Sequence, residues 1–289
     1  QGLYRPQDAG RLTGLSNISQ GLGLEVVGYA KGEGSKVQKN LGEGYDKNGN
    51  IDGGLDINYN ITTGLKASVT LNTDFAETEV DERQINLTRF PIRFPEKRDF
   101  FLEGANIYRF APSSGVYPYF SRKIGLQSGN PIPILYGGRI IGKIGKVEVA
   151  AQQVKTRETD LLNSEDFSVV RLKQNFWKES SMGILYTRRH TENGEQLPEP
   201  VKDRNTLGVD LSLNTSTFLK NQNLQFQAFA VIHNPNNLDE INNNIWDRSA
   251  RGLRFNFPND PWSGSLSYRE FGVSYDPAVG FSRRNSFRR

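Results

Sequence analysis

Thr206-Leu207-Gly208-Val209-Asp210-Leu211-Ser212-Leu213-Asn214 is the stretch that most clearly indicates the fold. Leucine or valine occupies every second position, and Thr, Gly, Asp, Ser or Asn occupies the positions between them. Successive side chains of a β-strand point to opposite faces, so the stretch predicts a strand with one apolar and one polar side. Leu65-Lys66-Ala67-Ser68-Val69-Thr70-Leu71-Asn72 alternates in the same way.

Alternation of this kind recurs and predicts eleven strands. They lie near residues 22–30, 51–61, 65–75, 136–144, 147–155, 166–176, 182–190, 206–216, 224–232, 250–257 and 265–275. The connections alternate between tight turns, such as 145–146, and long loops, such as 31–50 and 191–205. Short turns at one end and long loops at the other are typical of outer-membrane barrels. The predicted fold class is therefore all-β, an antiparallel transmembrane (outer-membrane) β-barrel.

The composition agrees with a barrel wall that faces lipid on one side only. Of the 289 residues, 36% are hydrophobic and 11% are aromatic, whereas soluble domains reach about 45–50% apolar residues when Gly is counted. Only the lipid-facing half of each barrel strand has to be apolar, which explains the low fraction. No run of about 18 apolar residues predicts a transmembrane helix.

Charge and cysteine content exclude several classes of function. The net charge of +4 is small for this length, so no nucleic-acid partner is predicted. Cysteine is absent, which excludes disulfides, thiolate metal sites and a cysteine nucleophile. The partner predicted from the strand pattern is the lipid bilayer, and the predicted location is the bacterial outer membrane.

The predicted domain organisation is simple. Residues 1–21, rich in Gly and polar residues, are expected to be a periplasmic lead-in, and residues 22–289 the barrel domain. Single-chain bacterial barrels have an even number of strands, and no closing strand is predicted within 276–289. The expectation is an incomplete barrel domain, the front part of a larger barrel.

Residues 77–133 interrupt the strand pattern. The segment contains six prolines, which central strands exclude. It also contains many large apolar side chains, such as Phe100, Phe101 and Tyr119, so it is not expected to be disordered. We expect a folded insert that packs into the mouth or lumen of the barrel as a plug.

The densest acidic cluster follows the third strand and contains Asp74, Glu77, Glu79 and Asp81. The last three have the opposite parity to Asp74, and a one-residue bulge would return all four to one face. Three readings stay open: a Ca²⁺ site, an acid and nucleophile pair of a glycosidase, and ion pairs inside a wet lumen. The basic residues that would form such pairs are Arg83, Arg89, Arg93, Lys97 and Arg98. No catalytic residue is assigned, and Ca²⁺ is the only cofactor considered.

A second group of charges lies within the insert. Phe94-Pro95-Glu96-Lys97-Arg98-Asp99-Phe100-Phe101-Leu102-Glu103-Gly104 mixes charges with aromatic residues. The candidate residues of this group are Arg89, Arg93, Glu96, Lys97, Arg98, Asp99 and Glu103. They predict either an ion-paired knot that fixes the insert against the wall or a gate that contacts a sugar or an anion.

Several of these stretches resemble a known family. They are Asn72-Thr73-Asp74-Phe75-Ala76-Glu77-Thr78-Glu79-Val80-Asp81, Asn86-Leu87-Thr88-Arg89-Phe90, residues 94–104 quoted above, and Tyr119-Phe120-Ser121-Arg122-Lys123-Ile124-Gly125. Together they resemble a family of unknown function that is common in Bacteroidota. In that family, a domain similar to carbohydrate-binding family 9 precedes a C-terminal outer-membrane β-barrel, and some members are titled membrane-associated hydrolase. The resemblance implies a barrel in the outer membrane and carries over no catalytic residue.

Three functions follow from these observations. The first is a non-enzymatic outer-membrane barrel that serves as a channel, a receptor or a component of a multi-protein assembly, linked to surface polysaccharide handling. The second is an outer-membrane hydrolase with a carboxylate site at the barrel mouth. The third is a soluble β-rich binding module.

Overall fold

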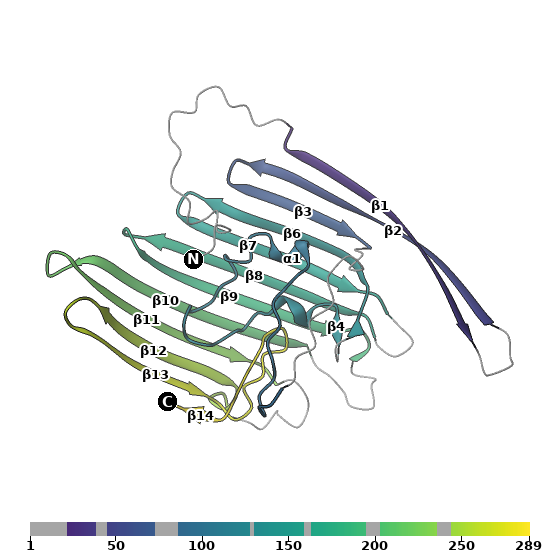
Figure 1. The fold of residues 1–289 in the computed structure, drawn as a ribbon. Helices are drawn as coiled ribbons and strands as arrows, with labels where there is room; N and C mark the ends of the chain where they lie inside the picture. Colours follow the sequence, from purple (N-terminus) through teal and green to yellow (C-terminus); the bar gives the residue numbers. More distant parts are fainter. Residues whose placement is uncertain are drawn as a thin grey trace.

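The computed structural model describes residues 22–38, 45–72, 86–127, 130–158, 163–194, 203–235 and 244–289. These residues form one large antiparallel sheet of twelve strands with almost no helix (Figure 1). The all-β prediction is confirmed. Among the described residues, no helix has the length and apolarity that a membrane crossing requires.

The strands of the sheet neighbour one another in chain order. They are β1 (Leu24–Gln38), β2 (Tyr45–Thr62), β3 (Leu65–Leu71), β6 (Ile134–Ile144), β7 (Val147–Thr156), β8 (Glu165–Phe176), β9 (Ser180–Thr191), β10 (Arg204–Phe218), β11 (Gln222–His233), β12 (Ser249–Pro258), β13 (Ser263–Phe271) and β14 (Phe287–Arg288). The elements between β3 and β6 are the short helix α1 (Asp99–Leu102), the 3₁₀ helix η2 (Ser121–Lys123) and a two-stranded ribbon of β4 (Leu126–Gln127) and β5 (Asn130–Pro131).

Each of the eleven expected strands coincides with a strand of this sheet, but one expected loop was wrong, and one short strand was not expected. The expected loop 31–50 is mostly strand, since β1 and β2 pair from Leu24↔Tyr59 to Gln38↔Tyr45. Its glycines and polar residues suggested a loop, yet ladder hydrogen bonds use only the backbone. The segment 276–289 also supplies β14, which pairs with β13 at Glu270↔Arg288 and Phe271↔Phe287.

The sheet is not closed into a barrel, so the barrel expected from the sequence stays a prediction. Within the described residues the sheet is open, with β1 and β14 as its edges. Before β14, residues 272–286 turn away from the sheet direction and contact the segment between β3 and β6: Phe281 N donates to Tyr117 O, and Phe120 N donates to Val279 O, both at 2.8 Å. A barrel closes only when its edge strands pair, and no such pairing exists here.

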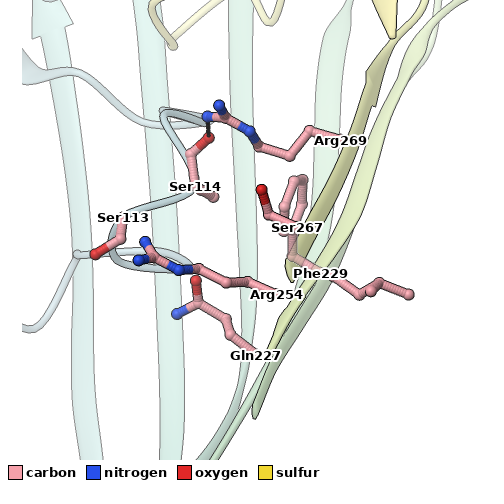
Figure 2. A pocket seen from close by; sticks show the side chains of 8 residues that line it. Ser113, Ser114, Gln227, Phe229, Arg254, Ser267 and Arg269 are labelled. Atoms are coloured by element: carbon pink, nitrogen blue, oxygen red, sulfur yellow. Dashed lines mark hydrogen bonds between the residues drawn. The ribbon is translucent and has the colours of Figure 1, made fainter. Parts of the chain in front are cut away.

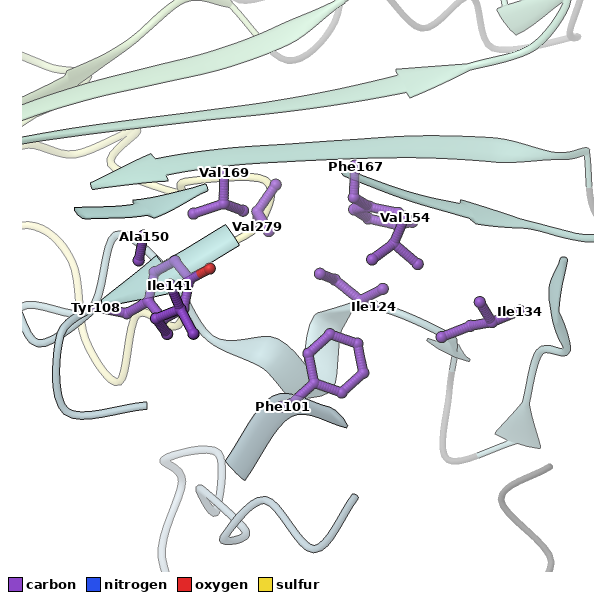
Figure 3. Packing of buried hydrophobic residues seen from close by; sticks show 10 residues of the cluster. All are labelled: Phe101, Tyr108, Ile124, Ile134, Ile141, Ala150, Val154, Phe167, Val169 and Val279. Atoms are coloured by element: carbon purple, nitrogen blue, oxygen red, sulfur yellow. The ribbon is translucent and has the colours of Figure 1, made fainter. Parts of the chain in front are cut away.

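Residues 86–127, called the insert below, lie against one face of the sheet (Figure 1). This face is called the covered face and the opposite one the bare face. Phe101, Tyr108 and Ile124 of the insert pack with strand residues such as Phe167 and Val169 (Figure 3). Burial of each such side chain contributes about 1.5–3 kcal/mol, so these contacts hold the insert on the sheet.

A second apolar cluster joins the insert to the later strands. Phe110, Ala111 and Val116 of the insert pack against β9, β11, β12 and β13. The strand residues of this cluster are Leu185, Phe229, Val231, Ala250 and Phe271, and Tyr275 covers them. The insert therefore spans the covered face from β6 to β13.

No segment of the described chain packs over most of the bare face. Register connects its residues from strand to strand, for example Leu172↔Ile184↔Val209. Its exposed apolar side chains include Val26, Tyr59, Val69, Ile140, Leu172, Ile184, Val209, Leu253 and Leu266, which are between 42% and 71% exposed. We call this continuous surface the apolar band.

Candidate functional site

The candidate site is the covered face together with the insert, because charged side chains concentrate there. The most deeply buried ion pair joins Arg171 of β8 to Asp210 of β10: Arg171 Nη1 lies 2.5 Å from Asp210 Oδ1, and the side chains are 1% and 9% exposed. Arg171 Nη2 also donates to Arg109 O at 3.2 Å, and Ala111 N donates to Asp210 Oδ2 at 3.3 Å. The pair thus binds the backbone of the insert on both sides of Phe110.

Glycines in the sheet make room for these contacts. A Cβ on Gly208 would lie 2.9 Å from the Phe110 ring, and one on Gly183 would lie 2.6 Å from the Arg171 guanidinium. The Arg171 guanidinium lies 5.5 Å from the centroid of the Phe110 ring. Small residues on the covered face therefore allow the insert to approach the strands closely.

A second contact joins the insert to β3 and β6. Glu103 forms ion pairs with Arg139 at 2.5 Å and with Lys66 at 2.7 Å. Arg139 also donates to Phe100 O and Glu103 O. Burial raises the pKa of Glu103, but the Lys66 hydrogen bond and the charge of Arg139 outweigh burial and hold the pKa below its ordinary value. Glu103 is therefore a carboxylate at neutral pH.

A third contact lies within the insert. Glu96 and Arg98 form a bidentate pair, with both nitrogen–oxygen distances at 2.8 Å. Arg98 continues to Ile124 O at 2.6 Å and Ser121 O at 2.8 Å. Burial raises the pKa of Glu96, but the hydrogen bonds and the charge of Arg98 lower it by more than burial raises it. The pKa of Glu96 therefore lies below its ordinary value. The bidentate pair orients Arg98, and its bonds to the Ser121 and Ile124 carbonyls join the start of the helical region to residues 121–124.

The remaining candidates of the insert are arranged differently. Arg93 stacks on the Tyr117 ring at 4.3 Å and Arg89 on the Phe90 ring at 5.2 Å. Lys97 is half-buried, and Asp99 is exposed at the start of α1. The candidate group thus separates into an internal pair, a contact with the wall and two stacked arginines. A gating or ligand-binding role for it stays a prediction.

The predicted acidic cluster of Asp74, Glu77, Glu79 and Asp81 lies outside the described residues. The described part of the chain contains no group of three or more His, Asp or Glu side chains that could hold a metal ion. His190 lies beside Asp203, and His233 is buried, with Asp276 N donating to its Nε2 at 3.0 Å.

The insert itself encloses a hollow of about 470 Å³. Tyr108, Tyr117 and Tyr119 contribute aromatic surface to it, and Arg93 and Arg109 contribute charge. Burial raises the pKa of Tyr119, which therefore keeps its proton and accepts a hydrogen bond from Gln152 at 2.9 Å. Clefts of about 300–1,000 Å³ with aromatic walls and a few polar groups are typical ligand sites.

A smaller pocket of about 60 Å³ lies between the insert and strands β11 to β13 (Figure 2). Ser113 and Ser114 line it from the insert. The strand residues that line it are Gln227, Phe229, Leu253, Arg254, Ser267 and Arg269. Arg269 Nη1 donates to Ser114 O at 2.5 Å and closes one side.

Sequence reasoning did not single out Arg139, Arg171, Asp210, Arg254 and Arg269 as site residues. Period-two alternation places Asp210 on the polar side of its strand, which was the available signal. The partners of these residues lie far away in the chain: Arg171 contacts the insert 62 positions upstream. Only the folded arrangement brings them together.

A comparison with protein families gives one match. A family model described as a domain of unknown function (DUF5916) matches residues 24–168. The matched range runs from the start of β1 into β8 and includes the whole insert. No curated protein and no solved structure matches the chain.

Proposed function

The chain belongs to the DUF5916 family of domains of unknown function, and from this premise we propose that its sheet is part of the wall of an outer-membrane β-barrel. In this proposal the insert partly fills the lumen, and the protein acts as a channel or receptor for surface saccharides. The observation that carries the proposal is the apolar band on the bare face, opposite a covered face that is charged and occupied by the insert.

The extent of the apolar band supports a lipid-facing wall. Monomeric soluble proteins rarely expose contiguous apolar patches larger than a few hundred Å². Here exposed apolar side chains recur from β1 to β13 in direct register. In a barrel such residues face lipid, and the alternate residues face the lumen.

The borders of the band also support the proposal. At the long-loop end, ion pairs replace apolar residues on the bare face: Arg188 lies 2.7 Å from Asp203, and Lys155 lies 3.2 Å from Glu192. Trp177 and Trp262 lie in the tight turns after β8 and β12, and both are 79% exposed. Charged and aromatic side chains border the hydrocarbon layer in known barrels.

The free edges of the sheet require further pairing if the sheet enters a membrane. Unpaired backbone groups cost several kcal/mol each in hydrocarbon, so open sheet edges do not occur there. The proposal therefore includes additional strands that pair with β1 and with the edge formed by β13 and β14. These strands would close the wall around the insert.

The hollow in the insert supports a saccharide ligand. Its tyrosine rings offer flat apolar surfaces, and Arg93 and Arg109 offer hydrogen-bond donors. Sugar rings present one apolar face and several hydroxyls, so this combination suits them. The hollow lies on the covered face, which is the lumen side of the proposed wall.

Conductance tests the proposed role of the insert. Replacing residues 86–127 with a Gly-Ser linker should raise single-channel conductance in a planar bilayer, because the insert occupies the covered face. A heat-dependent shift in gel mobility verifies that the variant has folded. A folded variant that keeps a low conductance would contradict the role of the insert as a plug. A current that added polysaccharide does not block would contradict the role as a saccharide channel.

A further inference from the structure

We propose that the pocket between the insert and strands β11 to β13 is an oxyanion site that binds a carboxylate, sulfate or phosphate group of a small acidic solute. The inference goes beyond the membrane role. It stands on the covered face alone and does not require the sheet to close.

Strand pairing brings three of the lining residues side by side. Gln227, Arg254 and Ser267 lie directly opposite one another on β11, β12 and β13. The next row on the same face contains Phe229, Gly252 and Arg269. A Cβ on Gly252 would lie 2.9 Å from the Phe229 ring, so the glycine lets this ring lie flat beside the pocket.

Arg254 has no partner of its own. Within the described residues its side chain makes no hydrogen bond, ion pair or ring contact, although the residue is half-buried and lines the pocket. Figure 2 shows the Arg254 and Gln227 side chains directed from the strands toward the Ser113–Ser114 loop. A guanidinium offers five N–H donors and no acceptor, so this group is available to bind an acceptor that enters the pocket.

The opposite side of the pocket is fixed by the insert. Arg269 donates to Ser114 O, and Val116 N donates to the Ser114 side-chain oxygen at 3.1 Å. Ser113 has a positive φ value of 70°, a conformation that residues other than glycine rarely adopt. Strained backbone of this kind persists only where surrounding contacts hold it, and it is frequent at ligand sites.

The chemistry of the lining selects an anion. Two arginines, an amide and serine hydroxyls line the pocket, and no Asp or Glu of the described chain is among the lining residues. Arg254 and Arg269 are diagonal neighbours on adjacent strands, so their charges repel until an anion lies between them. The nearby carboxylate of Asp210 is already paired with Arg171.

The size of the pocket limits what enters it. Its volume is about 60 Å³, several times the roughly 10–15 Å³ that a cavity needs to hold one water molecule. This volume suits an oxyanion group and excludes a whole sugar ring. Arginine binds carboxylate and phosphate groups through two parallel hydrogen bonds, which gives Arg254 the role of main ligand.

Calorimetric titration of the purified, detergent-solubilised protein tests the site. The probes are sodium sulfate, sodium phosphate and sodium glucuronate at fixed ionic strength, with glucose as the uncharged comparison. We expect saturable binding of at least one of the three anions and no binding of glucose. Arg254→Gln should weaken anion binding by about tenfold or more, because a hydrogen bond to a charged group contributes about 1.5–3 kcal/mol.

Two further variants separate a binding site from general charge effects. Arg284→Gln removes one exposed arginine outside the pocket and should leave the affinity unchanged. Arg254→Lys keeps the positive charge but cannot form two parallel hydrogen bonds to an oxyanion. Its anion affinity should therefore lie between those of the wild type and Arg254→Gln. Without anion, Arg254→Gln should not lower the melting temperature, because Arg254 has no internal partner to lose.

The outcomes decide the proposal. It is overturned if none of the three anions binds saturably, or if Arg284→Gln weakens binding as much as Arg254→Gln. A fall in melting temperature for Arg254→Gln without anion would also contradict it, since Arg254 would then be a structural residue.

Discussion

Replacing Arg171 with leucine is expected to detach the insert from the sheet. The variant leaves the Asp210 carboxylate, 9% exposed, with the Ala111 N–H as its one remaining hydrogen-bond donor among the described residues. Removing one partner of a buried ion pair costs about 3–5 kcal/mol, because the other charge stays buried without compensation. Release of the insert exposes Asp210 to water, so the loss should appear as weaker docking of residues 109–111.

Limited proteolysis measures this docking. Trypsin should cut at Arg109 faster in Arg171→Leu than in the wild type, while the gel mobility of the intact sheet stays the same. Arg171→Leu combined with Asp210→Asn should recover much of the protection, because asparagine carries no charge and still accepts from Ala111 N. Equal cleavage in the wild type and Arg171→Leu would show that the pair does not hold the insert.

The surface pair Arg188–Asp203 provides the matched control for burial. Its nitrogen–oxygen distance is 2.7 Å, close to the 2.5 Å of the buried pair, but its side chains are 36% and 42% exposed. Exposed ion pairs contribute about 0–1 kcal/mol. Arg188→Leu should therefore leave trypsin sensitivity unchanged, and a large effect would mean that burial does not explain the Arg171 result.

Ile184→Arg is expected to block insertion into phospholipid vesicles. Ile184 lies in the middle of the apolar band, opposite Leu172 and Val209, and is 50% exposed. An arginine on the lipid face of a barrel costs about 2–4 kcal/mol at the centre of the bilayer. If the bare face lies in water instead, the same change is a surface substitution that alters the free energy of unfolding by about 0.5 kcal/mol or less.

His190→Arg controls for the added charge. His190 lies on the same strand and the same face as Ile184, but beyond the band and beside Asp203. Arginine at this position places its charge beside the Asp203 carboxylate and outside the apolar band, so insertion should proceed as in the wild type. The readout is the fraction of protein with heat-dependent gel mobility after mixing with vesicles, and equal insertion of both variants would contradict a lipid-facing band.

The strands could be predicted from sequence because period-two alternation is a local signal. Leu207, Val209 and Leu211 identify both a strand and its apolar side without reference to the rest of the chain. The extension of β1 and β2 to Gln38 and Tyr45 could not be predicted, since backbone pairing leaves no mark in a run of Gly and polar residues.

The site could be predicted only in part, for a related reason. Composition indicated that residues 77–133 fold, and the charges around Glu96 and Glu103 were visible. Their partners were not: Glu103 contacts Arg139, 36 positions away, and Arg269 contacts Ser114, 155 positions away. Such pairings depend on which insert residue meets which strand, and no local pattern encodes that.

The orientation of the bare face toward lipid is the central claim, and fluorescence quenching tests it most directly. The chain has no cysteine, so single cysteines at positions 182, 184, 185, 186 and 187 of β9 can each carry one fluorophore. In vesicles of brominated lipid, the account predicts strong quenching at Met182, Ile184 and Tyr186 and weak quenching at Leu185 and Thr187. Uniformly weak quenching at all five positions would contradict it.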